Sequence, residues 1–249
     1  MDINVNTVYQ TVLMILNKEQ RGYMTPTEFN TVSTQVQLEI FEKYFDDLNQ
    51  QLRVPQADTD YADRQENIDE KLAIFKTFGN ATYTAVGSLS YFVLPTSDIY
   101  GDVVSFYRLG NVLYNDEKVV QRLDRHEFYY ANQSRLTKPS TINPAYLYEN
   151  QKLFIKPTTI KDKIKVDYIR KPNDVIWGFT PGSVGQYVWN DTPYSLSNPT
   201  GSTNFEIHES EQTEVILKIL LYSGIIIRDP EVVQTAAALV QADEVNKKS

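Results

Sequence analysis

Few residues in this 249-residue chain are of the types that carry out catalysis or bind metals. There is no cysteine, which excludes disulfides, thiolate metal sites and cysteine nucleophiles. The two histidines, His126 and His208, are too few for a histidine-rich metal site. His126 is followed by Glu127, but neighbours in sequence do not face each other on a helix, so they do not form an acid–base pair. With Glu209 and Glu211, His208 offers at most an adventitious metal site in a loop before a helix.

Carboxylates are frequent but nothing in the sequence pairs them. The carboxylates that could act together as a catalytic pair are Asp46 with Asp47, Asp58 with Asp60, and Asp167 with Asp174. A glycosidase needs two carboxyl groups at a set distance in space, which sequence spacing neither supports nor excludes. The glycine-rich phosphate loops, the serine elbow and the HExxH zinc motif are all absent. No catalytic, cofactor-binding or metal site is therefore predicted, no cofactor is expected, and a hydrolase is the least supported interpretation.

The clearest candidate for recognition is a long segment at about 178–205. It is rich in Gly, Ser, Thr, Asn and Pro, with Tyr187, Trp189 and Tyr194 spread through it. A loop of this length is usually functional or disordered, and the aromatic residues argue against disorder. We therefore expect an ordered excursion that docks on another subunit or another protein. The alternative is a long Ω-loop that packs on its own domain.

Composition and charge are those of a globular chain. Hydrophobic residues make up 41% and charged residues 22%, with a net charge of −8. The acidic balance argues against a nucleic-acid-binding module, but it is compatible with a wall that DNA passes without sticking. The N-terminus lacks the pattern of a signal peptide. The most apolar window, Val215–Ile227, contains Lys218 and is shorter than the roughly 20 residues of a membrane span.

The N-terminal part of the chain has helical periodicity. Apolar residues recur at intervals of three and four between Val5 and Leu16. A second helix is expected to start at a capping box formed by Thr25 and Glu28 and to end near Arg53. A third helix is expected from about residue 58 to about residue 78, with an apolar face only in its second half.

The C-terminal part is also helical. A buried helix is expected from Ser210 to Arg228, followed by a corner at Asp229-Pro230. The last helix has small residues on its apolar face, so it can approach a partner closely and is expected at a subunit or portal boundary. These small residues are Val233, Ala236, Ala237 and Val240.

The middle of the chain has the features of β-structure. Residues 82–94 predict two short strands or one strand bent at Gly87. We also expect a strand at 103–107, a turn at 109–111 leading into a strand at 112–114, a hairpin over 146–155 and a strand at 164–169. A short helix is expected at 123–131. The predicted fold class is therefore α+β: a helical bundle from residues 1–80 and 206–249 that carries an inserted antiparallel β domain, 81–205.

Several segments together resemble virion proteins of tailed phages. RGYMTPTEFNTVSTQVQLEIFEKYF resembles the N-terminal helix of virion proteins of crAss-like gut phages, which are podoviruses. YFVLPTSDIYGDVVSF resembles the β entry of podovirus head-to-tail connector proteins of the adaptor type. KLFIKP and KVDYIRKP resemble later strands of such proteins. The closing helix, the DPE corner and the Ala-rich last helix match the adaptor layout, and it is the order of these segments that carries the resemblance.

The resemblance implies a structural role and no enzymatic one. Such proteins form rings, usually of twelve copies, in the connector beneath the portal, where they extend the DNA channel, retain packaged DNA and dock the tail. The implied partners are further copies of the chain, the portal, and other connector and tail proteins. Packaged DNA would pass without sequence-specific binding, and no membrane is involved. The implied location is the portal vertex or tail of a virion assembled in the bacterial cytoplasm.

The candidate partner interface combines the aromatic excursion with the last helix. Its residues are Tyr187, Trp189, Tyr194, Val233, Ala236, Ala237 and Val240. The alternative is a carbohydrate-binding or adhesin-like module that uses the aromatic residues of 178–205. Helices at both ends of the chain argue against that alternative, because such modules are usually all-β.

Overall fold

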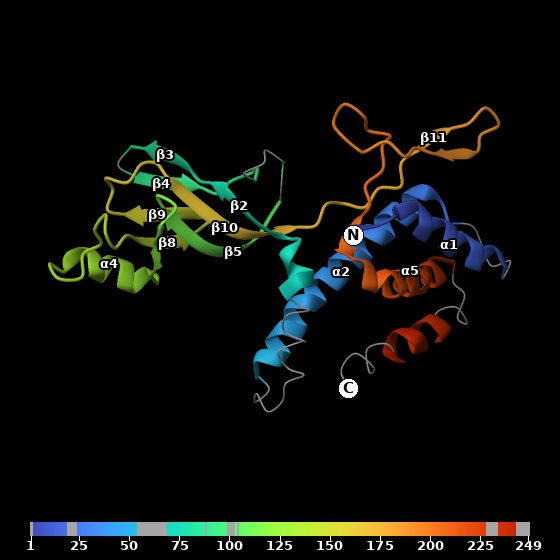
Figure 1. Cartoon of the computed structure of the whole chain (residues 1–249), viewed down its shortest axis with the longest axis horizontal. Coiled ribbons are helices and arrows are strands. Elements are labelled where there is room, and N and C mark those ends of the chain that lie inside the picture. The colour runs from blue at the N-terminus through green and yellow to red at the C-terminus, as the bar shows by residue number, and fades with distance from the viewer. Residues whose placement is uncertain are drawn as a thin grey trace. The chain divides into compact units, whose positions relative to one another are not determined.

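The computed structural model describes residues 2–18, 24–53, 69–87, 89–98, 103, 105–227 and 234–242, with the backbone alone at 18, 46–53 and 225–227. The fold is mixed α+β with several antiparallel sheets (Figure 1). The chain divides into two compact units. The first, here called the helical unit, comprises Met1–Ile74 and Pro172–Ser249. The second, the β unit, comprises Phe75–Lys171.

The helical unit is built on three helices. They are α1 (Val5–Lys18), α2 (Pro26–Arg53) and α5 (Gln212–Ile227), and residues 69–73 and 234–242 are also helical. α1 begins where the Asn4 side chain accepts a hydrogen bond from the Thr7 amide, 3.1 Å long. α2 begins with the predicted capping box. The Thr25 hydroxyl accepts from the Glu28 amide at 3.3 Å, and the Glu28 carboxylate accepts from the Thr25 amide at 2.9 Å.

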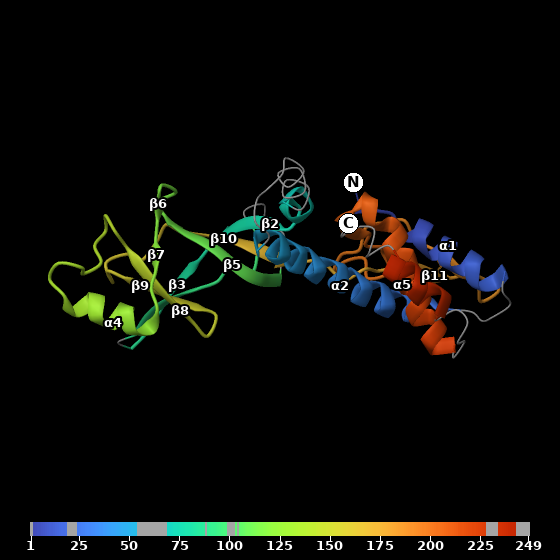
Figure 2. The same ribbon diagram turned by 90° about the horizontal axis from the view of Figure 1, so that it is seen from below.

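Apolar side chains join these helices. α5 packs against both α1 and α2, and Figure 2 shows α2 and α5 side by side. Phe29, Ile40 and Phe41 of α2 are fully buried, as are Val215 and Ile219 of α5. Strand β1 (Asp2–Ile3) pairs antiparallel with β13 (Phe205–His208), after which the 3-10 turn η1 (Glu209–Glu211) leads into α5. No helix among the described residues is long and apolar enough to cross a bilayer.

The β unit consists of two sheets and one helix. A four-stranded sheet has the order β2-β10-β5-β6, and a five-stranded sheet has the order β3-β4-β9-β8-β7, in which β7 and β8 are parallel. The strands are β2 (Lys76–Asn80), β3 (Thr82–Val86), β4 (Leu89–Val93), β5 (Ser105–Tyr114), β6 (Lys118–Val119), β7 (Gln121–Arg122), β8 (Ala145–Glu149), β9 (Lys152–Lys156) and β10 (Ile164–Lys171). Helix α4 spans Arg125–Gln133. One hydrophobic cluster contains residues of both sheets, among them Phe92, Leu153, Val112 and Val166.

Several local predictions for the β unit are confirmed. Residues 82–93 form two strands on either side of Gly87, whose φ is +61°. The hairpin over 146–155 is β8 and β9, and the short helix is α4 with Asp124 at its N-cap. These features depend on contacts between residues close in sequence, which is why the sequence signals them.

Two predictions for this unit are wrong. The third helix does not reach Phe78, because β2 (Lys76–Asn80) pairs there with β10; the start of that predicted helix lies outside the described residues. The expected turn at 109–111 lies inside the continuous strand β5. A side chain at Gly110 would come within 2.9 Å of the Asp167 carbonyl oxygen of β10. The glycine therefore permits a close approach between two strands, next to a shift in their register, and not a turn.

The segment from 172 onwards also differs from expectation. The sequence places it in the β insertion, whereas its contacts group it with the helical unit. The excursion contains a hairpin of β11 (Phe179–Pro181) and β12 (Tyr187–Trp189), followed by an irregular loop to residue 204 (Figure 1). The predicted corner at Asp229-Pro230 lies outside the described residues.

Candidate functional site: an uncharged surface on the helical unit

Three polar side chains on one face of α2 hold the backbone that leads into the excursion. Asn30, Thr34 and Gln37 are spaced four and three residues apart, so they lie on the same side of the helix. The Trp177 amide donates to Asn30 at 2.8 Å, and the Val175 amide donates to the Thr34 hydroxyl at 3.1 Å. We call these three side chains the ladder on α2. It was not predicted from the sequence, although the spacing of four and three residues was visible.

Gln37 fastens both ends of the excursion to the helix. Its amide nitrogen donates to the Asn173 carbonyl at 2.7 Å, and its carbonyl oxygen accepts from the Glu206 amide at 2.8 Å. The Glu206 carboxylate also accepts from the backbone and side-chain nitrogens of Asn173, both at 2.9 Å. Because the side chain of Gln37 is buried, its own two bonds are shielded from competition with water, whereas the two between Glu206 and Asn173 are exposed.

Hydrogen bonds also order the interior of the excursion. The Ser202 hydroxyl accepts from the Trp189 indole at 3.1 Å and donates to the Asn190 carbonyl at 2.6 Å. The backbones of Gly178 and Gly201 approach so closely that a side chain on Gly178 would lie 2.4 Å from the Gly201 carbonyl carbon. The excursion is thus ordered, as both interpretations of the sequence expected, and its docking on a partner stays a prediction.

A row of aromatic rings runs from the core of the helical unit to its surface. Tyr9 lies 4.7 Å from Phe29 and 4.4 Å from Trp177, measured between ring centroids. Trp177 then stacks on Phe179 at 6.0 Å, and Phe179 meets Tyr187 edge-on at 4.9 Å. The first rings are buried, whereas Tyr187 is 45% exposed. Tyr187 is therefore held in a fixed position by a buried aromatic support.

An open groove of about 440 Å³ lies between α1 and the tip of the β11–β12 hairpin. Its lining residues are Tyr9, Gln10, Leu13, Trp177, Gly185, Gln186 and Tyr187. None of these residues is charged, and the groove brings together segments that lie far apart in the sequence. Sequence reasoning did not identify it, because nothing local links Leu13 to Tyr187.

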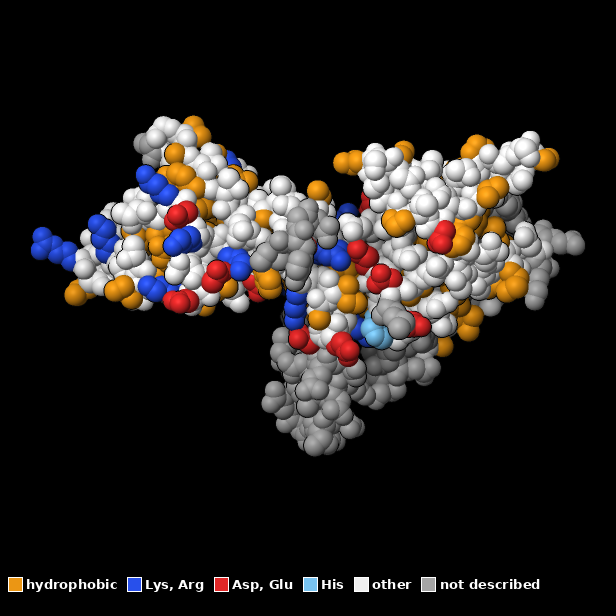
Figure 3. All heavy atoms as spheres, turned by 45° about the horizontal axis from the view of Figure 1, so that its top comes forward, with side chains coloured by type: hydrophobic (Ala, Val, Ile, Leu, Met, Phe, Trp, Pro, Cys, Tyr) orange, Lys and Arg blue, Asp and Glu red, His pale blue; other side chains and the backbone are white. Residues whose placement is uncertain are grey.

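The segments around the groove form what we call the neutral surface, residues 3–17 and 175–205. Its only Asp, Glu, Lys or Arg is Asp191, whereas the helical unit as a whole has 10 Lys and Arg against 23 Asp and Glu. Figure 3 shows uncharged and hydrophobic side chains over the two projecting loops. The most exposed hydrophobic side chains of the neutral surface are Met14, Val184, Tyr187, Val188, Tyr194 and Leu196. A surface of this kind on an acidic unit suits contact with an uncharged partner surface.

The predicted interface residues fall into different environments. Tyr187 and Tyr194 are exposed on the neutral surface, but Trp189 is half-buried and its indole nitrogen is used internally. In the helical stretch 234–242, Ala236 is buried. Two further predicted residues of that stretch, Ala237 and Val240, are half-buried, and Val233 lies outside the described residues.

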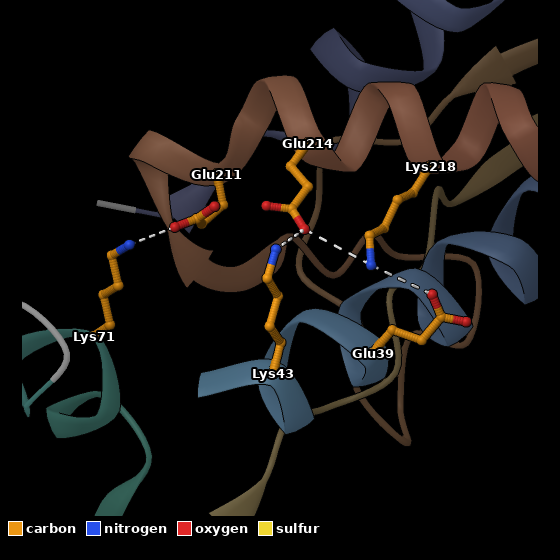
Figure 4. A network of polar contacts seen from close by, with 6 residues as sticks. All are labelled: Glu39, Lys43, Lys71, Glu211, Glu214 and Lys218. Carbon is orange, nitrogen blue, oxygen red and sulfur yellow. Dashed lines mark hydrogen bonds and ion pairs between the residues drawn. The ribbon is translucent and has the colours of Figure 1, made fainter. Parts of the chain in front are cut away.

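The helical unit also contains a network of buried and partly buried charges, drawn in Figure 4. Glu214 of α5 lies 3.1 Å from the Lys43 ammonium and 3.7 Å from that of Lys218. Lys218 in turn lies 3.6 Å from Glu39 of α2. In a separate pair, Lys71 contacts Glu211 of η1, whose side chain is also buried. From the sequence, Glu211 was considered only beside His208, and the ion pairs of Glu211 and Glu214 were not predicted.

One tyrosine extends this network. The Tyr222 hydroxyl donates to the Glu39 carboxylate, and this bond, with burial and the negative charge of Glu39, raises the pKa of Tyr222 to about 12. Each carboxylate of the network has a lysine beside it, so the arrangement fixes α5 on α2. Within the described part of the chain, no group of three or more His, Cys, Asp or Glu side chains could hold a metal ion.

The comparisons with known proteins add no assignment to these observations. No protein-family model matches this chain. A search of curated proteins likewise finds no match.

Proposed function

We propose that this chain is a non-enzymatic structural protein of a tailed-phage virion. It forms a ring in the head-to-tail connector below the portal, where it extends the DNA channel and docks the tail. The proposal draws on the resemblance of its segments to podovirus connector proteins. The single observation that supports it best is the neutral surface, an ordered projection that exposes large hydrophobic side chains on an otherwise acidic unit.

The charge distribution supports self-association through this surface. Copies of a unit with 23 acidic and 10 basic residues repel each other over most of their surfaces. The neutral surface avoids that repulsion. Its internal hydrogen bonds and its attachment to Gln37 fix it before contact, which lowers the conformational entropy lost on association.

In the proposed ring, the helices form a bundle that carries the β unit. α1, α2, α5 and the helical stretch 234–242 contribute to this bundle, with the last of these near a subunit or portal boundary. Acidic side chains suit a channel wall, because DNA adheres where Lys and Arg neutralise its phosphates. Packaged DNA would then pass without sequence-specific binding, while the portal, other connector proteins and tail proteins bind the outer surfaces.

Imaging and mass measurement of the purified protein, alone and mixed with its portal protein, would test the proposal. We expect a closed ring, or a monomer that becomes a ring on the portal. A protein that stays monomeric and does not bind the portal would contradict it.

The groove supports a second candidate, a carbohydrate-binding or adhesin-like module. It presents the exposed ring of Tyr187 beside the side-chain amides of Gln10 and Gln186. Aromatic rings with a few polar groups are typical of small-molecule sites. Glycan-array binding that is lost on deletion of residues 178–205 would favour this function over the first.

A further inference from the structure

We propose that the loop around Leu196 of one copy inserts into the groove beside Tyr187 of the next copy. This inference depends on the proposed ring, and it names the contact through which the copies join. The loop and the groove lie at different places on the helical unit, so the contact is heterologous. Such a contact closes into a ring when the rotation between copies fits.

The inserting loop is built to hold a hydrophobic side chain outwards. Leu196 is 97% exposed, at the apex of a turn closed by Ser195 and Asn198. The backbone amides of these two residues donate to each other's carbonyl oxygens at 3.2 and 2.9 Å. The Asn198 side chain also donates to the Thr192 hydroxyl at 2.6 Å. The turn is therefore fixed by polar contacts of its own, and Leu196 takes no part in them.

The groove provides a complementary hydrophobic surface. Leu13 and Tyr187 line it, and Trp177 forms part of its lining below them. The groove is not filled by Leu196 of the same copy, because that side chain is almost fully exposed. If Leu196 of one copy enters the groove of the next, the exposed leucine and the apolar lining of the groove are both removed from water, which is favourable.

Electrostatics favours a second copy as the occupant. Both surfaces are free of charge apart from Asp191, so they avoid the repulsion between the acidic parts of two helical units. Because salt screens that remaining repulsion, we expect association to strengthen as ionic strength rises. A contact built on ion pairs would respond in the opposite way.

The absence of cysteine allows a direct test by cross-linking. Gln10→Cys places a thiol at the exposed edge of the groove, and Leu196→Cys places one on the loop. When the two variants are mixed and oxidised, alone and with the portal protein, we expect a disulfide-linked dimer that contains one of each. The matched control is Leu136→Cys, in the β unit, where the leucine is also 97% exposed. Mixed with Gln10→Cys, it should give no such dimer.

A charge at the same position gives an independent readout. Leu196→Asp should weaken self-association at least tenfold in sedimentation or mass photometry, whereas Leu136→Asp should change it less than twofold. Both variants should fold, because neither leucine is buried. A ring that forms normally with Leu196→Asp and gives no cross-link would overturn this contact and leave the proposed function standing. A monomer that never assembles, with or without portal, would overturn the proposed function itself.

Discussion

The helical unit and the β unit are stabilised in different ways. In the described residues, the buried Ser, Gln and Glu side chains all belong to the helical unit: Ser33, Gln37, Glu211, Glu214 and Ser223. The main cluster of the β unit consists of aliphatic and aromatic side chains such as Val112, Leu153 and Val166, and it includes the buried hydroxyl of Tyr168. The helical unit therefore depends on a few directional polar contacts, and the β unit depends on the packing of apolar side chains.

The difference follows from where backbone groups find their partners. In the β unit, neighbouring strands satisfy one another's backbone groups, so its core side chains need only fill space. In the helical unit, the extended backbone at 173–177 lies along a helix, which has no free backbone groups on its side. Side chains such as Asn30 and Gln37 must supply those bonds. Directional contacts fix one arrangement, but each is sensitive to substitution.

The two units also differ in the sign of their charge. The β unit has 14 Lys and Arg against 9 Asp and Glu, whereas the helical unit has 10 against 23. The overall net charge of −8 is thus the sum of a basic unit and a strongly acidic one. The overall charge therefore describes neither unit. Only the helical unit is acidic enough to form a channel wall to which DNA does not adhere.

The largest effect is expected at the buried charges. Glu214→Ala removes the carboxylate next to Lys43 and Lys218 and should lower the free energy of unfolding by about 3 kcal/mol, the lower end for a broken buried pair, because both lysines keep some exposure. Hydrogen exchange should place the loss in α2 and α5, and denaturant unfolding should give its size.

The matched control is the exposed ion pair of the β unit. Glu149 lies 3.4 Å from Arg125, and both side chains are more than one-third exposed. Glu149→Ala should therefore have a far smaller effect on unfolding than Glu214→Ala. If the two substitutions lower the free energy of unfolding equally, the claim that buried charges stabilise the helical unit specifically is wrong.

The next effect is expected at the ladder on α2. Gln37→Ala leaves the Asn173 carbonyl and the Glu206 amide without their side-chain partner and should cost about 1–3 kcal/mol. Amide exchange should accelerate at 173–177 and at Glu206 while the β unit keeps its protection. Gln35→Ala, an exposed glutamine on the same helix, serves as the control and should change stability little. Equal exchange in both variants would show that the ladder does not hold the excursion.

The sequence predicted those parts of the fold that depend on neighbours in the chain. The capping box of Thr25 and Glu28, the N-cap Asp124 and the hairpin around Glu149–Lys152 all involve residues within a few positions of each other. Each has a composition signal that a single segment displays. Likewise, the aromatic residues of 178–205 indicated an ordered excursion.

The parts that were missed depend on distant residues. Phe78 continues a helical pattern, yet its strand is fixed by pairing with Asp167. Gln37 binds Asn173, and the groove joins Leu13 to Tyr187. A helix position that faces an extended backbone resembles, in sequence, any other polar position on a helix. For this reason the sequence named Tyr187 and Tyr194 as candidates, which stay a prediction, and did not indicate that residues 3–17 lie beside their segment.

A pH-dependent effect is expected at Tyr222. Its pKa is raised to about 12 by the bond to Glu39, against an ordinary value of 10, so the folded state holds the proton more tightly than the unfolded chain. The stabilisation is complete below pH 10 and is lost as the pH rises to about 12. In Tyr222→Phe the stabilisation is absent, so the difference in unfolding free energy between the parent and this variant should be constant below pH 10 and shrink above it. A difference that stays constant to pH 12 would contradict the assignment.

The smallest effect is expected in the core of the β unit. Ile155→Val removes one methylene from the hydrophobic cluster and should cost about 0.5–1.5 kcal/mol, because the loss is that of transfer and a small cavity, with no polar group left behind. Ile219→Val in α5 is the matched change in the helical unit. It should cost about as much, since Ile219 is also a buried isoleucine and the two units differ in their polar contacts, which this substitution does not touch. Denaturant unfolding of both variants measures the comparison. If Ile155→Val cost as much as Glu214→Ala, the β core would be as sensitive to substitution as the charge network, and the contrast between the two units would fail.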